Sequence, residues 1–493
     1  MSKKGKKVWE RVYNERTSYL MLLPNIIMFA VFTVYPILWA LRYMLFDYRG
    51  YGEAKFVGMD NFVRVFTRDP VFWDSVVNTF VYVGGKLILT LPIAFMLAFL
   101  LSKSTRINAV SQSIIFTPTI MSSAVMALIF YLLFNTYNGE INRFLMWLGV
   151  IDENINWLGV QHAMLTVIIL AVWGGVGNYM VYFIAGLTGI STDVYESAKL
   201  DGANGAQTLF RITIPLLAPV LKMILMLALV ISFMDMQSIM VLTEGGPMGK
   251  TNAELTLGGG ILPEKWQIEN YIYAFQKLEF GKYTLNSVVL ALLTVLFTVT
   301  TASMAAYIIA RREFPGKKLL TTSYLLSMFI SVGSVALYPL YGLLHAVGLT
   351  SNMVGLALLL TGGQAANIFM VSGFVRSVPK ELDEAATIDG AGTFRIFWQI
   401  IVPAIKPILG VIALFAFRTA WNEFVTAQVF TMSNPGLKTL SVAVANLRYS
   451  ANAAAEWHIM TAGASIALIP ILIVYLLANR QFITGLTAGA VKG

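Results

Sequence analysis

The chain has 493 residues, of which 57% are apolar and only 12% are charged, and its net charge is +9. Soluble globular proteins carry about 25% charged residues, so this composition excludes an ordinary soluble enzyme. Cysteine is absent, which excludes a disulfide framework and thiolate metal ligands, and the three histidines are scattered along the chain. No metal site is therefore predicted.

The excess positive charge begins in a basic segment, residues 1–19, that contains Lys3, Lys4, Lys6 and Lys7. Because this run directly precedes an apolar stretch, it is typical of a cytoplasmic membrane anchor and not of a nucleic-acid-binding surface. The glycine–lysine–threonine run at 249–251 resembles the end of a phosphate-binding loop, but Glu244 stands where that motif needs glycine. We therefore do not expect this run to bind a nucleotide.

Ten apolar stretches are long enough to cross a bilayer. They are expected to be helices, because backbone groups in lipid must be hydrogen-bonded within their own segment. They lie near residues 20–43, 78–101, 112–135, 163–188, 217–242, 285–310, 320–345, 352–375, 405–430 and 459–479. With the basic segment in the cytoplasm, the alternation of loops also places the tail, residues 481–493, on the cytoplasmic side. The sequence thus predicts an all-α polytopic protein of the cell membrane.

One polar pattern occurs twice, with Gly202 and Gly390 placed 188 positions apart. The first copy, within residues 191–215, holds Glu196, Ala198, Asp201, Gly202, Ala203 and Pro215. The second copy, within residues 379–403, holds Glu384, Ala386, Asp389, Gly390, Ala391 and Pro403. An even number of predicted spans separates the copies, so both run in the same direction through the membrane. This indicates two parallel-related halves.

Each copy is expected to form two short helices joined by a glycine turn. In the first copy, Thr192 or Asp193 can cap a helix that runs to Leu200, and Gly202 permits the turn. In the second copy, the first helix is expected over residues 380–387. Such a segment on the cytoplasmic face can transmit a push from a partner into the span that follows it. The alternative, an ordinary amphipathic connector, is disfavoured because the pattern occurs twice at one offset.

The repeated pattern, Glu-x-Ala-x-x-x-Gly followed by an apolar residue and proline, resembles the coupling ("EAA") motif of permease subunits of bacterial ABC importers. Two further elements are similar to the sugar-uptake, maltose-like branch of that family. They are the run Leu242, Thr243, Glu244, Gly245, Gly246 and Pro247, and the tail that ends in Lys492 and Gly493. The resemblance covers nearly the whole chain. It implies a fused pair of permeases with the type I ABC importer transmembrane-domain fold.

The resemblance also implies a mechanism and a set of partners. Each coupling helix would dock on one subunit of an ABC ATPase homodimer, whose closure would flip the path and admit a sugar from an extracytoplasmic solute-binding protein. Glu196 and Glu384 would help to seat the loops, Gly202 and Gly390 would make the turns, and the tail residues Lys492 and Gly493 would reach the ATPase. ATP and magnesium would bind to the ATPase, so no cofactor and no catalytic residue are expected in this chain.

The domain organisation departs from the family in one respect. Such permeases usually have six spans each, whereas the sequence predicts five in each half. The first unit, residues 20–254, is expected to lack its sixth span, and the second, residues 285–480, its first, with an external junction at 255–284. A natural fusion with an internal deletion, a designed fusion and a damaged gene remain open explanations. A damaged path would leave a non-transporting scaffold.

Charged side chains inside a span cost about 2.5–3.5 kcal/mol and therefore indicate a polar path. Asp235 and Glu423 are at equivalent positions in the fifth span of each half, and Trp173 and Trp421 can stack on a sugar ring. The candidate path comprises Trp173, Asn178, Asp235, Gln237, Trp421, Asn422 and Glu423. The alternative is that these polar groups bond to one another or to backbone.

Arg418 lies one helical turn from Asn422 and is in reach of Glu423. The other charges within the spans, Lys86 and Lys222, are expected to lie at the membrane interface or to extend to it. A secondary, ion-coupled transporter is the competing function for a chain with repeated spans. It gives no reason, however, for two coupling-type loops.

Overall fold

The computed structural model is an assembly of helices and describes most of the chain. The described ranges are residues 12–48, 52–102, 105–137, 139–188, 190–235, 268–277, 279–330 and 333–446, with short runs at 239, 242–243 and between 462 and 473. Within these ranges, the β structure is one antiparallel pair of two-residue strands, β1 (Phe46–Asp47) and β2 (Lys55–Phe56). The predicted all-α architecture is confirmed.

The first half is organised around helix α5 (Pro70–Leu101), which is long and apolar enough to cross a membrane. The Asp69 side chain caps its start by accepting a hydrogen bond from the backbone N–H of Phe72, and Pro70 occupies the first turn, where no intrahelical N–H partner is needed. Helix α5 packs along α9 (Ala163–Thr188). The other elements of this half are α4 (Asp60–Arg68), α6 (Arg106–Ile120), α7 (Ser123–Leu133), α8 (Glu140–Trp147), α10 (Thr192–Leu200), α11 (Gly205–Gln207), η2 (Thr208–Thr213) and α12 (Ile214–Phe233).

The second half is built in the same way around α15 (Phe280–Arg311), which packs against α19 (Ala365–Ser377) and α23 (Lys406–Asn422). Small buried residues, Ala302, Ala305 and Ala306, line α15 and permit this close packing. Its other elements are α14 (Ile268–Lys277), α16 (Lys317–Ser327), η3 (Gly333–Ala336), α17 (Leu337–Ala346), α18 (Met353–Leu360), α20 (Glu381–Ile388), α21 (Thr393–Ile396), η4 (Phe397–Ile401), α22 (Val402–Ala404), α24 (Val425–Thr431), η5 (Pro435–Leu437) and α25 (Leu440–Asn446).

Half of the candidate membrane spans among the described residues are broken helices. In this part of the chain, four continuous helical stretches are long and apolar enough to span a bilayer: Arg16–Tyr43, Pro70–Leu101, Ala163–Leu187 and Phe280–Arg311. Four more candidate spans are helix pairs with a sharp bend, including α6 with α7 at 96° and α18 with α19 at 64°. The stretch expected as a span at 320–345 is instead divided among α16, η3 and α17. The stretch at 459–479 lies largely outside the described residues.

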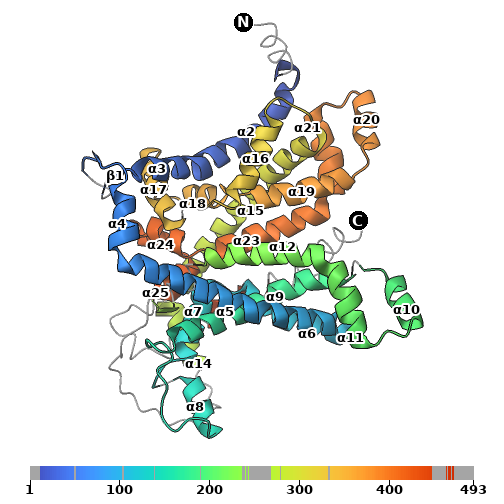
Figure 1. Cartoon of the computed structure of the whole chain (residues 1–493). Coiled ribbons are helices and arrows are strands. Elements are labelled where there is room, and N and C mark those ends of the chain that lie inside the picture. Colours follow the sequence, from blue (N-terminus) through green and yellow to red (C-terminus); the bar gives the residue numbers. More distant parts are fainter. Residues whose placement is uncertain are drawn as a thin grey trace.

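The first apolar stretch of the chain packs against the second half. It comprises α2 (Arg16–Phe29), η1 (Ala30–Val34) and α3 (Tyr35–Tyr43), and Figure 1 shows α2 beside α16. Leu22 is fully buried in one apolar cluster with residues of α15, and the hydroxyl of Tyr324 donates a hydrogen bond to Asn25. The hydroxyl of Tyr19 donates to the carbonyl oxygen of Pro315 at 2.8 Å.

A glycine between α18 and α19 allows the η1 segment to approach closely. A Cβ atom at Gly362 would lie 2.4 Å from the Cβ of Phe32, which is far inside van der Waals contact. The Thr33 hydroxyl donates a hydrogen bond to the Gly362 carbonyl oxygen at 3.2 Å, so a side chain of the N-terminal stretch satisfies a backbone group that the helix break frees. The two halves of the chain are therefore connected by packing as well as by sequence.

We expect Leu22→Ala to destabilise the fold by about 2–5 kcal/mol, because it opens a cavity in a fully packed site. Leu20→Ala is the matched control: it removes the same atoms from the same helix, but the Leu20 side chain is 65% exposed. The measurement is the thermal unfolding midpoint in lipid nanodiscs. Equal shifts for the two variants would contradict the packing of α2 against the second half.

Candidate functional site

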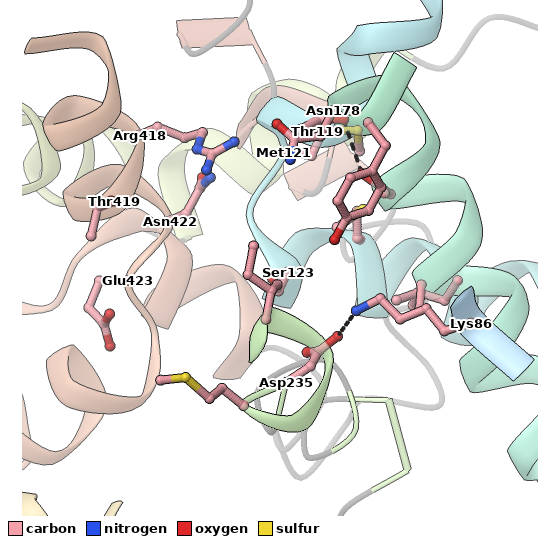
Figure 2. A pocket seen from close by; sticks show the side chains of 18 residues that line it. Lys86, Thr119, Met121, Ser123, Asn178, Asp235, Arg418, Thr419, Asn422 and Glu423 are labelled. Atoms are coloured by element: carbon pink, nitrogen blue, oxygen red, sulfur yellow. Dashed lines mark hydrogen bonds and ion pairs between the residues drawn. The ribbon is translucent and has the colours of Figure 1, made fainter. Parts of the chain in front are cut away.

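A cavity of about 460 Å³ lies where helices of the two halves meet. Lys86 of α5, Asn178 of α9 and Asp235 after α12 come from the first half, whereas Arg418 and Asn422 come from α23 of the second. Figure 2 shows these side chains around a common space. This volume is within the range of about 300–1,000 Å³ that is usual for small-molecule pockets.

One wall of the cavity is a buried ion pair. Lys86 Nζ lies 3.0 Å from Asp235 Oδ2, and the Tyr82 hydroxyl donates a hydrogen bond to the same oxygen. The prediction that Lys86 extends to the membrane interface is wrong, because its side chain is only 6% exposed and Asp235 holds it inside. The sequence alone did not reveal this pair, since Lys86 and Asp235 lie far apart along the chain.

The two carboxylates of the predicted path stand just after helix ends. Helix α12 ends at Phe233, shortly before Asp235, and α23 ends at Asn422, directly before Glu423. Continuous spans were expected at 217–242 and 405–430, so the interruption of the second by Glu423 corrects that expectation. An oxygen of Glu423 accepts a hydrogen bond from the Thr426 backbone N–H at 2.8 Å, which satisfies the start of α24.

Asn422 connects the break in one half to the break in the other. Its side-chain nitrogen donates to the carbonyl oxygen of Ile120, the last residue of α6, at 3.0 Å. The Ser122 hydroxyl, between α6 and α7, lies 3.4 Å from the Asn422 carbonyl oxygen. Backbone groups that are freed at helix breaks within a membrane must find such partners or face water. The predicted path residue Asn422 therefore has a structural role at the cavity.

Arg418 differs from Lys86 in having no ion pair with a described residue. Its guanidinium is 5.9 Å from the ring of Phe415, and the predicted pair with Glu423 is not formed. In Figure 2 the guanidinium is directed toward Asn422, whereas the Glu423 carboxylate points away from it. Burial of a charge without a counter-charge costs on the order of several kcal/mol, so this arrangement calls for a reason.

The remaining residues of the predicted path lie in different surroundings. Asn178 lines the cavity, as do Asp235, Asn422 and Glu423. Trp421 is buried in an apolar cluster and stacks on Phe417 at 5.5 Å, and Trp173 contacts Phe130, so neither ring is part of the cavity wall. Gln237 and the tail residues Lys492 and Gly493 lie outside the described part of the chain. Within that part, no cluster of three potential metal ligands is present.

The two repeated loops have the same backbone geometry. Helix α10 ends in a turn in which Gly202 has a φ of 76°, and α20 ends in a turn in which Gly390 has a φ of 81°. In both, the following alanine N–H returns to a carbonyl oxygen one turn earlier: Ala203 to Ala198 and Ala391 to Ala386, each at 2.9 Å. This is a Schellman end, which requires a left-handed residue and therefore favours glycine.

The helix bounds of the loops differ slightly from expectation. Ser191, and not Thr192 or Asp193, caps α10, because its side chain accepts a hydrogen bond from the Asp193 backbone N–H. Helix α20 begins at Glu381 and ends at Ile388. Both loops then enter the next span through π-helical turns, η2 and η4, at equivalent positions. Glu196, Asp201, Pro215, Glu384, Asp389 and Pro403 are all exposed, whereas Ala198 and Ala386 are buried.

Each loop also presents apolar side chains that the motif analysis missed. Leu200 at the end of α10 is 89% exposed, and Ile388 at the equivalent end of α20 is 87% exposed. Phe210 and Trp398, again 188 positions apart, are exposed as well. A search of the sequence for apolar residues that are also 188 positions apart would have identified these two pairs. Figure 1 shows α10 and α20 projecting at the same end of the helices, at the right of the view.

The second loop is attached to its span by an ion pair. Arg311 Nε, at the end of α15, lies 3.1 Å from Asp383 Oδ2, and the side chains are 4% and 18% exposed. Arg311 also donates to the Val378 carbonyl oxygen at 2.6 Å. Burial raises the pKa of Asp383 above its ordinary value, and the charge of Arg311 only partly offsets this rise. In the first loop, Tyr195 stands at the position equivalent to Asp383.

Comparison with known proteins assigns the chain to a family. Residues 90–313 and residues 284–486 each match the family described as binding-protein-dependent transport system inner membrane component. The two matches overlap over residues 284–313, which is most of helix α15. The family domain is thus present twice, as the repeated loops indicate.

Similar proteins are permeases. The trehalose transport system permease protein SugB of Mycobacterium tuberculosis is 35% identical over 237 residues, which is 48% of this chain and 85% of the relative. The melibiose/raffinose/stachyose import permease protein MelC of Bacillus subtilis is 32% identical over 235 residues, or 47% and 84%.

A solved bacterial ABC transporter for import of the acidic polysaccharide alginate is similar at 24% identity with a TM-score of 0.43, over 48% of this chain and 80% of that one. By its two family matches, the chain is a pair of fused permease domains with the type I ABC importer transmembrane fold, and it belongs to the family of inner-membrane components of binding-protein-dependent transport systems.

Proposed function

We propose that this chain is the membrane-spanning permease of an ATP-driven, solute-binding-protein-dependent sugar importer. Sugar import is supported by the similar permeases, which are named for trehalose and for melibiose, raffinose and stachyose. The cavity between the halves, lined by hydroxyl and amide groups, is the candidate passage for the sugar. The chain lies in the cell membrane with both termini in the cytoplasm, and an extracytoplasmic solute-binding protein delivers the sugar.

The observation that supports ATP coupling best is the matched pair of loops. Two segments 188 positions apart have the same backbone geometry at their turns. Each also exposes a large apolar side chain at the end of its first helix, Leu200 in one and Ile388 in the other. An exposed apolar side chain of this size forgoes about 1.5–3 kcal/mol of burial, so two equivalent ones indicate that both face a partner. The partner is an ABC ATPase homodimer, since two equal subunits present two equal clefts.

The second loop is suited to transmit movement to the membrane. Arg311 joins Asp383 on α20 to the end of α15, and α15 packs against α19 and α23. Displacement of α20 therefore pulls on the helix at the centre of the second half. The loop itself continues through η4 and α22 into α23, whose far end carries the cavity residues Arg418 and Asn422. This route connects the docking surface to the cavity.

We expect a Leu200→Ser, Ile388→Ser double variant to lose co-purification with a co-expressed sugar-importer ATPase. The loss should reach about 2 kcal/mol or more per side chain if these residues are central to the interface. The thermal midpoint should hardly change, because both side chains are exposed. Val160→Ser, at a residue of 84% exposure away from the loops, is the control.

Full retention of the ATPase by the double variant would contradict docking through these side chains. Absence of ATPase from the native chain, in a monodisperse nanodisc sample, would contradict the importer function itself.

A second prediction concerns the ion pair at Arg311. Arg311→Met and Asp383→Leu should each lower the thermal midpoint and the ATPase stimulation, because each leaves a largely buried charge without its partner. The double variant should recover part of the loss, with a coupling free energy of about 0.5–3 kcal/mol in a double-mutant cycle. Lys318→Met removes one exposed charge nearby and is the control. Strictly additive losses would show that the pair does not act as a unit.

A further inference from the structure

We infer that the cavity between the halves takes a sugar that carries an acidic group, a carboxylate or a phosphate, and that Arg418 binds this group. The inference rests on the proposed transport function and narrows the class of its substrate. It follows from the charges in the cavity wall, taken one at a time.

The first cation, Lys86, is already neutralised. Asp235 Oδ2 lies 3.0 Å from Lys86 Nζ, and the same oxygen accepts a hydrogen bond from the hydroxyl of Tyr82. Because these groups satisfy one another inside the first half, neither the lysine nor the aspartate contributes a free charge to a ligand. The ion pair forms one end of the cavity wall. Selection of a ligand by its charge therefore depends on other residues.

The second cation, Arg418, has no carboxylate partner among the described residues. Arg418 is partly exposed as a residue, and it is one of the residues that line the cavity. Glu423, five residues later, directs its carboxylate away from Arg418 in Figure 2, and one of its oxygens accepts the Thr426 backbone N–H at 2.8 Å. Arg418 therefore places a permanent positive charge at the cavity, and no residue that the structure describes forms an ion pair with it.

Guanidinium is matched to an oxyanion by geometry as well as by charge. It is planar, stays protonated in proteins, and donates two parallel hydrogen bonds to a carboxylate or a phosphate. Thr119, Ser123, Asn178 and Thr419 also line the cavity and offer hydrogen bonds to the hydroxyl groups of a sugar. Among the described lining residues, Arg418 is the cation without an ion pair, and the Glu423 carboxylate is turned away from it. Together with the neutral polar groups, this arrangement fits an acidic sugar better than a neutral one.

The test is direct binding to the full chain in lipid nanodiscs, measured by isothermal titration calorimetry. Digalacturonate is compared with the neutral galactose disaccharide of the same linkage, and glucose 6-phosphate with glucose. The native chain should bind at least one acidic member about tenfold more tightly than its neutral partner, since hydrogen bonds to charged groups are the stronger ones. The two pairs distinguish a carboxylate from a phosphate.

The variants assign the preference to Arg418. Arg418→Gln should reduce the preference to near unity, and Arg418→Lys should keep part of it, because lysine retains the charge but not the planar pair of donors. Lys222→Gln, an exposed lysine outside the cavity wall, should keep the full preference. The ATPase co-purification of each variant confirms that it is folded.

Three results would overturn the inference. They are equal binding of acidic and neutral sugars, a preference for neutral ones, and an acidic preference that survives Arg418→Gln. If the native chain captures the ATPase but binds only neutral sugars, the inference of an acidic substrate is contradicted and the proposed function stands. If the native chain neither captures the ATPase nor binds any sugar, both are contradicted.

Discussion

The need to satisfy backbone groups at broken helices governs this structure. In an apolar surrounding, a free carbonyl or N–H must find a partner within the protein. The break between α6 and α7 is met by the side chain of Asn422, which belongs to the other half, and the break between α18 and α19 by Thr33 of the N-terminal stretch. Each break is thus completed by a segment that is distant in sequence, and this holds the two halves together.

The same breaks create the candidate site. A continuous helix presents only side chains to its neighbours, whereas a helix that ends inside the fold turns its chain and leaves space beside the turn. Asp235 and Glu423 stand at such ends, and the cavity lies between them and the bend of α6 and α7. The two cations in its wall differ in their pairing. Lys86 forms an ion pair with Asp235, whereas Arg418 forms no ion pair with a described residue. Two copies of one family domain thereby enclose a cavity whose two sides differ in charge pairing.

Asymmetry is also present at the repeated loops. Their turns are equal in backbone geometry and in the exposure of Leu200 and Ile388, which suits two equal partner subunits. Their attachment differs, because Arg311 and Asp383 form an ion pair in the second half and Tyr195 replaces the aspartate in the first. The N-terminal stretch adds to this difference by packing on the second half. The family domain occurs twice, yet most of helix α15 lies in both matches, so the second match begins before the first has ended.

The sequence by itself determined the class of the protein, its duplication and the turns of the loops. These are local properties: apolar length decides what can cross a bilayer, and a left-handed turn decides where glycine stands, as at Gly202 and Gly390. Only the tertiary structure decided the pairing of Lys86 with Asp235, the isolation of Arg418 from Glu423 and the burial of Trp421. It also decided that the first span packs against the second half. These outcomes depend on which distant helices meet and on where helices break, and hydrophobic periodicity along one segment carries no information about the segment that will satisfy its broken end.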